Sequence, residues 1–185
     1  MSIETQPEEA RLSARRLWIN LAIWGAILGV LAVVLGPLLR PLASEIAAGR
    51  IQGHAPDTAL FLAQKLPIKL HITAAVAAFV IGLVILARPK GDRLHKMIGW
   101  GWVVAMLTTA LSSLFITGIN GDFYSFIHLI SGWTLIALPT AIYLVRQGKV
   151  RQHAQTMVGL FVGGLLIAGG LTFLPGRLMF EMFFG

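Results

Sequence analysis

Four histidines recur at matching places in two similar stretches of the chain. His71 and His128 are 57 positions apart, and His95 and His153 are 58 positions apart. Each stretch runs from a histidine through an apolar run and a basic loop to a second histidine and another apolar run. Ionisable side chains in apolar spans are costly and tend to be functional, and neutral imidazole is the commonest metal ligand. The spacing therefore predicts two histidine pairs, one towards each face of a membrane.

The chemistry of these pairs depends on the further ligands that the chain offers. A lone zinc or copper ion needs more protein ligands, but the sequence has no cysteine and no carboxylate in the middle of its apolar runs. Haem supplies four nitrogen ligands and needs only two axial ones, so a bare histidine pair suits it. We expect one or two b haems, the outer held by His71 and His128 and the inner by His95 and His153. A structural or proton-handling role and a non-haem metal site remain alternatives.

Small and cationic residues near the histidines favour a porphyrin site. Gly99 and Gly132 each lie four positions, one helical turn, after one of the histidines. Lys69 and Arg177 fall close to the outer face, where a cationic side chain can pair with a haem propionate. Taken alone, such glycines are more typical of close helix packing, and such cations of membrane orientation.

Membrane-spanning helices are needed to position these residues, and the composition supplies them. The chain is 56% hydrophobic and 12% charged, whereas soluble domains carry about 25% charged residues. A helix needs roughly 20 apolar residues to cross a bilayer. Five continuous runs of about this length are predicted to span: Trp18–Leu39, Pro67–Ala87, Met97–Ile119, Phe123–Leu144 and Met157–Leu174. The fold class is therefore all-α, an integral membrane protein with five transmembrane helices.

The polar segments divide the chain into five parts. We expect a cytoplasmic tail at 1–16, a first transmembrane helix at 17–40, an outer amphipathic segment at 41–66, a four-helix histidine-bearing core at 67–174 and an outer tail at 175–185. Because the loops at 88–96 and 145–156 are short, the helices on either side of each form antiparallel hairpins. The core is therefore predicted to consist of two repeated hairpins.

The distribution of positive charge predicts the orientation in the membrane. The net charge is +7, but the cations collect in loops and form no stripe, which argues against nucleic-acid binding. With the N-terminus in the cytoplasm, ten lysines and arginines lie on the inner side and five on the outer side. Because inner loops carry the excess of positive charge, the N-terminus is predicted to be cytoplasmic and the C-terminus outside.

Several stretches resemble a known family. "LHITAAVAAFVIG", "HKMIGW" and "IHLISGWTLIALPTAIYLVRQGKVRQHAQTMVG", with the ending "FLPGR", look like the predicted bacterial membrane proteins of the domain of unknown function 2306. The resemblance covers the chain from about Lys69 to its end and includes all four histidines. It implies a protein of the bacterial inner membrane and brings no established activity.

The histidine layout is also similar to that of the cytochrome b561 superfamily. In that superfamily a four-helix core carries two b haems, ligated from its first and third helices and from its second and fourth. This likeness implies a transmembrane electron carrier whose chemistry is that of its cofactor, with a quinone or a redox protein as partner beside the lipid bilayer. The alternatives are a membrane accessory or assembly subunit, a small transporter, or a quinone- or metal-binding protein. Any of these could be an oligomer.

Overall fold

A computed structural model describes residues 25, 36, 39–49, 51–116 and 126–185, with no side-chain placement at 126 and 127. The chain divides into two compact units, Met1–Gln52 and Gly53–Gly185. In the first unit residues 39–47 are helical, and the hydroxyl of Ser44 donates a hydrogen bond to the carbonyl oxygen of Pro41 at 2.7 Å. The predicted tail at 1–16 and nearly all of the predicted helix at 17–40 lie outside the described residues.

The second unit consists of helices joined by short turns and loops, and no strand occurs in residues 53–116 and 126–185. Its helices are α2 (Thr58–Leu62), α3 (Leu66–Ala87), α4 (Arg93–Ser113), α5 (Phe126–Arg146), α6 (Val150–Leu160), α7 (Ala168–Gly170) and α8 (Leu178–Phe184). Between α6 and α7 the chain forms a π-helix, η1 (Phe161–Ile167), and a 3₁₀ turn, η2 (Leu171–Phe173), follows α7. The helical path from Val150 to Phe173 is therefore continuous, although its pitch changes along the way.

Local sequence explains where these helices begin and turn. The side chain of Asp92 accepts a hydrogen bond from the backbone N–H of His95 at 2.6 Å, which caps the first turn of α4. Asp57 caps α2 in the same way through the N–H of Leu60 at 2.9 Å. Gly91 and Gly148 have φ angles of 92° and 74°, a conformation that L-residues with a side chain rarely adopt. These glycines permit the tight turns that connect α3 to α4 and α5 to α6.

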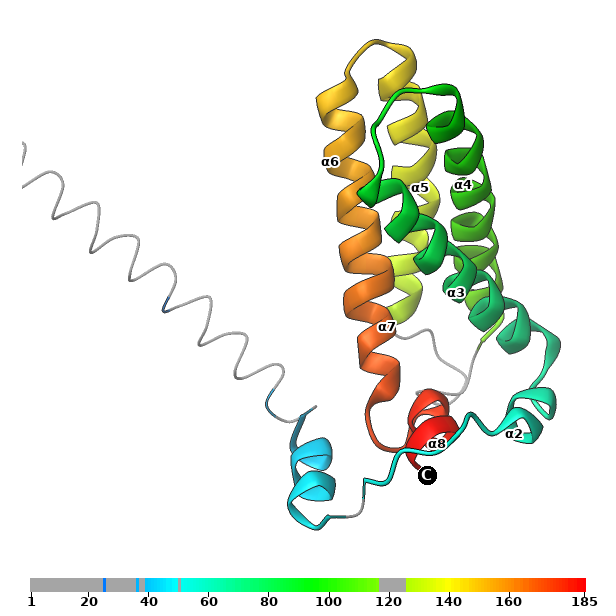
Figure 1. Cartoon of the computed structure of the whole chain (residues 1–185), viewed down its shortest axis with the longest axis vertical. Coiled ribbons are helices and arrows are strands. Elements are labelled where there is room, and N and C mark those ends of the chain that lie inside the picture. Colours follow the sequence, from blue (N-terminus) through cyan, green and yellow to red (C-terminus); the bar gives the residue numbers. More distant parts are fainter. Residues whose placement is uncertain (1–24, 26–35, 37–38, 50, 117–125) are drawn as a thin grey trace, which may run out of the picture. The chain divides into compact units, whose positions relative to one another are not determined.

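Figure 1 shows α3, α4, α5 and α6 side by side as a bundle, with α2 and α8 at its lower end. α3 packs against α4, α4 against α5, and α5 against α6, while η1 contacts α3 and closes the ring of helices. Both connecting turns lie at the upper end of the bundle in Figure 1, so α4 and α6 begin there and α3 begins at the lower end.

The core of the bundle is formed where α3, α4, α5 and η1 meet. Its fully or nearly fully buried side chains are Ala78, Trp102, Val103, Met106, Ala137, Leu138, Leu160, Phe161 and Leu165. Phe161 stacks on Phe79 with ring centroids 5.7 Å apart. Gly82 makes room for this aromatic contact, because a Cβ atom added there would lie 2.5 Å from the Phe161 ring and 3.0 Å from Trp102 Nε1.

Three of the described helical stretches are long and apolar enough to cross a membrane: Leu66–Ala87, His128–Arg146 and Val150–Phe173. They correspond to the predicted spans Pro67–Ala87, Phe123–Leu144 and Met157–Leu174. The last is a continuous helical path that begins seven residues before the predicted start at Met157. Large apolar side chains project from them, including Val76, Val80, Leu129, Ile136 and Ile167, each more than 50% exposed. This outward apolar surface suits contact with lipid.

Helix α4 differs from the three candidate spans. The predicted span Met97–Ile119 corresponds to α4, which begins earlier, at Arg93, and ends earlier, at Ser113. Its C-terminal half is rich in threonine and serine, so α4 is less apolar than the three candidate spans. α4 also has seven buried residues, whereas the more apolar α3 has two. α4 is therefore less apolar than the three candidate spans and is better covered by the other helices than α3 is.

Candidate histidine sites

Buried polar side chains are concentrated at one end of the bundle. The buried polar residues in the described ranges are Thr109, Ser112, Ser113, His128, Ser131 and Thr134. All belong to the last turns of α4 or the first turns of α5, which meet at the lower end of the bundle in Figure 1. We call His71, Thr109, Ser112, Ser113, His128 and Ser131 the serine–histidine cluster. Buried polar groups are costly unless hydrogen-bonded, and polar residues inside membrane spans tend to be functional. The cluster of buried polar residues therefore makes this end of the bundle the candidate functional site.

His71 enters the cluster from the second turn of α3. Its Nδ1 atom lies 2.9 Å from the carbonyl oxygen of Thr109 and 3.5 Å from Oγ of Ser112. A carbonyl oxygen only accepts hydrogen bonds, so Nδ1 carries the hydrogen and Nε2 of the neutral ring keeps its lone pair. Metal-bound histidines are commonly oriented in this way, by donation of the other ring N–H to a carbonyl oxygen.

His128 enters the same cluster from the first turn of α5 and is 8% exposed. One turn further along α5, Ser131 pairs with Ser113 of α4 through their hydroxyls at 2.5 Å. Ser113 follows Ser112 directly, so the cluster runs from His71 on α3 through α4 to His128 on α5. The direct hydrogen bond of His71 is to α4, and His128 lies one turn from the Ser113–Ser131 pair, so the two histidines predicted for the outer site lie at the same end of the bundle.

The other two histidines lie in the first turns of α4 and α6, at the upper end of the bundle in Figure 1. Nδ1 of His153 lies 2.9 Å from the carbonyl oxygen of Ala141 on α5, which fixes the same tautomer as in His71. Nδ1 of His95 is buried and has no hydrogen-bond partner within the described part of the chain. Two of the four predicted ligands therefore have Nδ1 bonded to a carbonyl oxygen of the preceding or following helix.

The predicted neighbours of the histidines have different surroundings. A Cβ atom added at Gly99 or Gly132 would meet no other atom within 4 Å, so both glycines border open space. The ammonium group of Lys69 donates to the carbonyl oxygen of Leu62 at 3.3 Å and links α3 to α2. Arg177 is the N-cap residue of α8. Among the residues that the structure describes, no group of three or more histidine and carboxylate side chains is placed to hold a metal ion.

Two features of this region were not anticipated from the sequence. The first is the serine and threonine network, whose signal is the run "LTTALSS" at the end of α4 facing "HLISGWT" at the start of α5. The second is η1, a π-helix at "FVGGLLI"; π-helical segments occur frequently at functional sites. The glycine-rich stretch from Gly159 to Gly170 signals this irregularity, but periodicity alone does not specify it.

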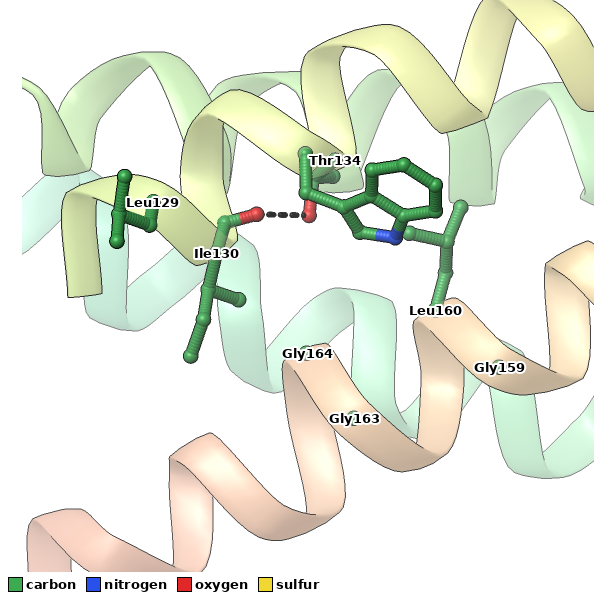
Figure 2. A pocket seen from close by; sticks show the side chains of 8 residues that line it. Leu129, Ile130, Thr134, Gly159, Leu160, Gly163 and Gly164 are labelled. Atoms are coloured by element: carbon green, nitrogen blue, oxygen red, sulfur yellow. Dashed lines mark hydrogen bonds between the residues drawn. The ribbon is translucent and has the colours of Figure 1, made fainter. Parts of the chain in front are cut away.

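A groove lies beside η1, between α5 and α6. It has a volume of about 320 Å³ and is lined by Leu129, Ile130, Trp133, Thr134, Gly159, Leu160, Gly163 and Gly164. Figure 2 shows the single hydrogen bond among these residues, from the hydroxyl of Thr134 to the carbonyl oxygen of Ile130, at 2.9 Å. That hydroxyl is satisfied within its own helix, so the groove offers an almost wholly apolar surface.

The long apolar helices, their exposed apolar side chains and the buried polar end of the bundle define a helical membrane protein. A family described as "Predicted membrane protein (DUF2306)" matches residues 68–181, more than half of the chain. The chain belongs to this family. No curated protein and no solved structure shows significant similarity to it. These comparisons do not support the likeness to the cytochrome b561 superfamily, which stays a prediction from the histidine spacing.

Proposed function

We propose that this protein is a transmembrane electron carrier that holds b-type haem between pairs of histidines. The outer pair is His71 and His128, and the inner pair is His95 and His153. The observation that carries the proposal is the hydrogen bond from Nδ1 of His71 to the carbonyl oxygen of Thr109. It leaves Nε2 as an unprotonated ligand atom, which is the state that axial coordination of iron requires.

Three further observations support the outer site. His128 is buried in the same serine–histidine cluster and comes from a different helix. Gly132, one turn after His128, borders open space on α5. Haem needs two axial ligands only, so the lack of a third histidine or carboxylate in the described residues is compatible with haem and unfavourable for a lone metal ion.

The inner site rests on a parallel geometry. The bond from His153 to Ala141 fixes the ring tautomer as the bond to Thr109 does for His71. His95 is set in the first turn of α4 by the Asp92 cap, and its buried Nδ1 has no hydrogen-bond partner in the described residues. Gly99, one turn after His95, borders open space. Both inner histidines lie at helix starts, so this site is the less enclosed of the two.

The proposal includes a topology for the whole chain. Five spans, with the N-terminus in the cytoplasm and the C-terminus outside, would place the cluster end of the bundle near the outer face of a bacterial inner membrane. The four-helix core would be two repeated hairpins, α3–α4 and α5–α6. The excess of cations in the two hairpin loops supports this orientation, because inner loops carry most lysine and arginine.

In this scheme bound haem supplies a one-electron couple between ferric and ferrous iron, and the protein supplies ligation, orientation and burial. Thr109 and Ala141 hold the imidazole tautomers through their carbonyl oxygens. The apolar core between the two ends, centred on Met106, Leu138 and Phe161, separates the sites and excludes water from the space between them. Lys69 and Arg177 would be cationic partners for propionates at the outer face.

The test is the absorption spectrum of the purified full-length protein, oxidised and then reduced with dithionite. We expect a Soret band that shifts on reduction, and a haem-to-protein ratio of one or two. His71→Ala and His128→Ala should each remove the same spectral component, and His95→Ala and His153→Ala the other. His54→Ala is the matched control, because His54 is exposed and its ring bonds the carbonyl oxygens of Ala55 and Gly185. A colourless protein after expression with haem supplementation would overturn the proposal.

A further inference from the structure

A second groove opens beside the serine–histidine cluster, between the start of α3 and the end of α4. It has a volume of about 290 Å³ and is lined by Leu66, Pro67 and Leu70 on one side and by Thr108, Leu111, Ser112 and Phe115 on the other. We call it the lateral groove. No charged side chain is among its lining residues.

The walls of the lateral groove are apolar and open outward. Leu66, Leu111 and Phe115 are 66%, 49% and 73% exposed, which in a membrane protein means contact with lipid. The volume is at the lower end of the range for ligand sites, roughly 300–1,000 Å³. Such a space accommodates a single ring or a short chain and leaves any longer tail in the bilayer.

Two hydroxyl groups, of Thr108 and Ser112, line this otherwise apolar groove, and one of them lies beside the proposed haem ligand. Ser112 is 7% exposed, and its hydroxyl donates to the carbonyl oxygen of Thr108 at 2.6 Å. The same Oγ atom lies 3.5 Å from Nδ1 of His71. Only the side chain of Ser112 therefore separates a molecule in the groove from the ring of His71.

We propose that the lateral groove binds the head ring of a membrane quinone. This inference rests on the proposed function for the choice of a redox-active ring. The hydroxyls of Ser112 and Thr108 donate to carbonyl oxygens of their own helix, and each oxygen keeps a lone pair that can accept the hydrogen of a quinol hydroxyl. Either hydroxyl can donate to the carbonyl of a quinone once it turns away from its helix partner. A phospholipid phosphate would need a cation in the lining, and an acyl chain has no group to pair with these two oxygens.

The experiment is photoaffinity labelling of the full-length protein in phospholipid nanodiscs with an azido-substituted ubiquinone analogue. We expect labelled peptides from 66–70 and 108–115, and loss of label when excess decyl-ubiquinone is added. Leu111→Trp should fill the groove and reduce labelling by about tenfold, equivalent to about 1.4 kcal/mol. Ser112→Ala should weaken labelling about threefold to tenfold through loss of one hydrogen bond.

The matched control is Val104→Trp. Val104 is 61% exposed, lies on α4 two turns before Leu111 and does not line the groove, so this variant should label like the wild type. Equal labelling in Leu111→Trp and Val104→Trp, label confined to other peptides, or competition by phospholipid acyl chains alone would overturn the inference. The haem content of the same samples separates the two proposals: labelled protein without haem contradicts only the electron-carrier function, and haem-loaded protein without label contradicts only the quinone site.

Discussion

His153 of α6 lies with its Nδ1 atom 2.9 Å from the carbonyl oxygen of Ala141 on α5, a fully buried residue. The bond joins two helices that are consecutive in the chain, as the bond from His71 to Thr109 joins α3 and α4. In both cases one ring nitrogen performs a structural task and the other is left with a lone pair. A structural role and a ligand role can therefore be separated by experiment, because they use different atoms of the same ring.

Asparagine at position 153 makes that separation. The side-chain N–H of His153→Asn can replace Nδ1 as the donor to Ala141, but nothing replaces Nε2. We expect His153→Asn to unfold in detergent close to the wild-type temperature and to lose the inner haem component. His153→Ala should lose both the haem component and about 1 kcal/mol of stability. Full haem occupancy in a folded His153→Asn protein would show that His153 is structural only.

Gly82, the one glycine of α3, should tolerate an added side chain poorly. An added Cβ atom would lie 2.5 Å from the ring of Phe161, which is 4% exposed and stacked on Phe79, so the ring has little room to move. We expect Gly82→Ala to destabilise the protein by about 1–3 kcal/mol, the usual range for overpacking. Thermal unfolding in detergent measures this effect.

The control for this substitution is Gly99→Ala, because a Cβ atom there meets nothing within 4 Å. It should leave stability unchanged or raise it by up to about 1 kcal/mol, since alanine is the better helix former. Phe161→Leu should recover part of the stability lost in Gly82→Ala. If the Gly82→Ala and Gly99→Ala variants unfold at the same temperature, the result contradicts the inference that Gly82 packs too closely against Phe161 to accept a Cβ atom.

The sequence predicted the three apolar spans that the structure describes, and the physical reason is visible in α3. Its 22 residues include Pro67 at the start and no acidic residue, and the basic residues Arg88 and Lys90 follow its last residue, so composition alone specifies both span and boundaries. The prediction for α4 was less accurate, because the span Met97–Ile119 runs through Ser112 and Ser113, whereas α4 ends with these two serines. They are tolerated because neighbouring helices cover them and backbone carbonyls four or three positions earlier accept their hydrogen bonds.

The sequence could select the residues of the candidate site but not their geometry. The offset between His71 and His128 identified two equivalent positions, and both lie at the end of the bundle where the buried serines and threonines are found. That His71 would bond Thr109 could not be inferred, because the rotation of α4 about its axis depends on packing around Trp102 and Met106. Periodicity gives the spacing of residues along a helix, whereas helix rotation and ring tautomer are set by tertiary contacts.

The hydroxyl pair Ser113–Ser131 is expected to couple α4 to α5. Both serines are buried, at 2% and 7% exposure, and their oxygens are 2.5 Å apart. A double-mutant cycle with Ser113→Ala, Ser131→Ala and the double variant should give a coupling energy of about 0.5–2 kcal/mol, as for other interhelical hydrogen bonds in membranes. Thr140→Ala is the control, because Thr140 is exposed and its hydroxyl donates to the carbonyl oxygen of Ile136 in its own helix. Additive effects of the two serine substitutions would argue against a stabilising bridge.

The orientation of the core can be tested directly because the chain has no cysteine, so every introduced thiol is the only one. Lys90 and Lys149 are exposed in the two hairpin turns, and Ala55 is exposed ahead of α2. Because positive charge favours the cytoplasmic side, we expect a membrane-impermeant maleimide to label Ala55→Cys in intact cells and to label Lys90→Cys and Lys149→Cys only after the membrane is opened. The cysteine-free parent supplies the background. Labelling of Lys90→Cys from one side and Lys149→Cys from the other would be incompatible with hairpins that both turn at one end of the bundle. Labelling of both in intact cells would keep the hairpins, reverse the orientation and move the serine–histidine cluster to the inner face.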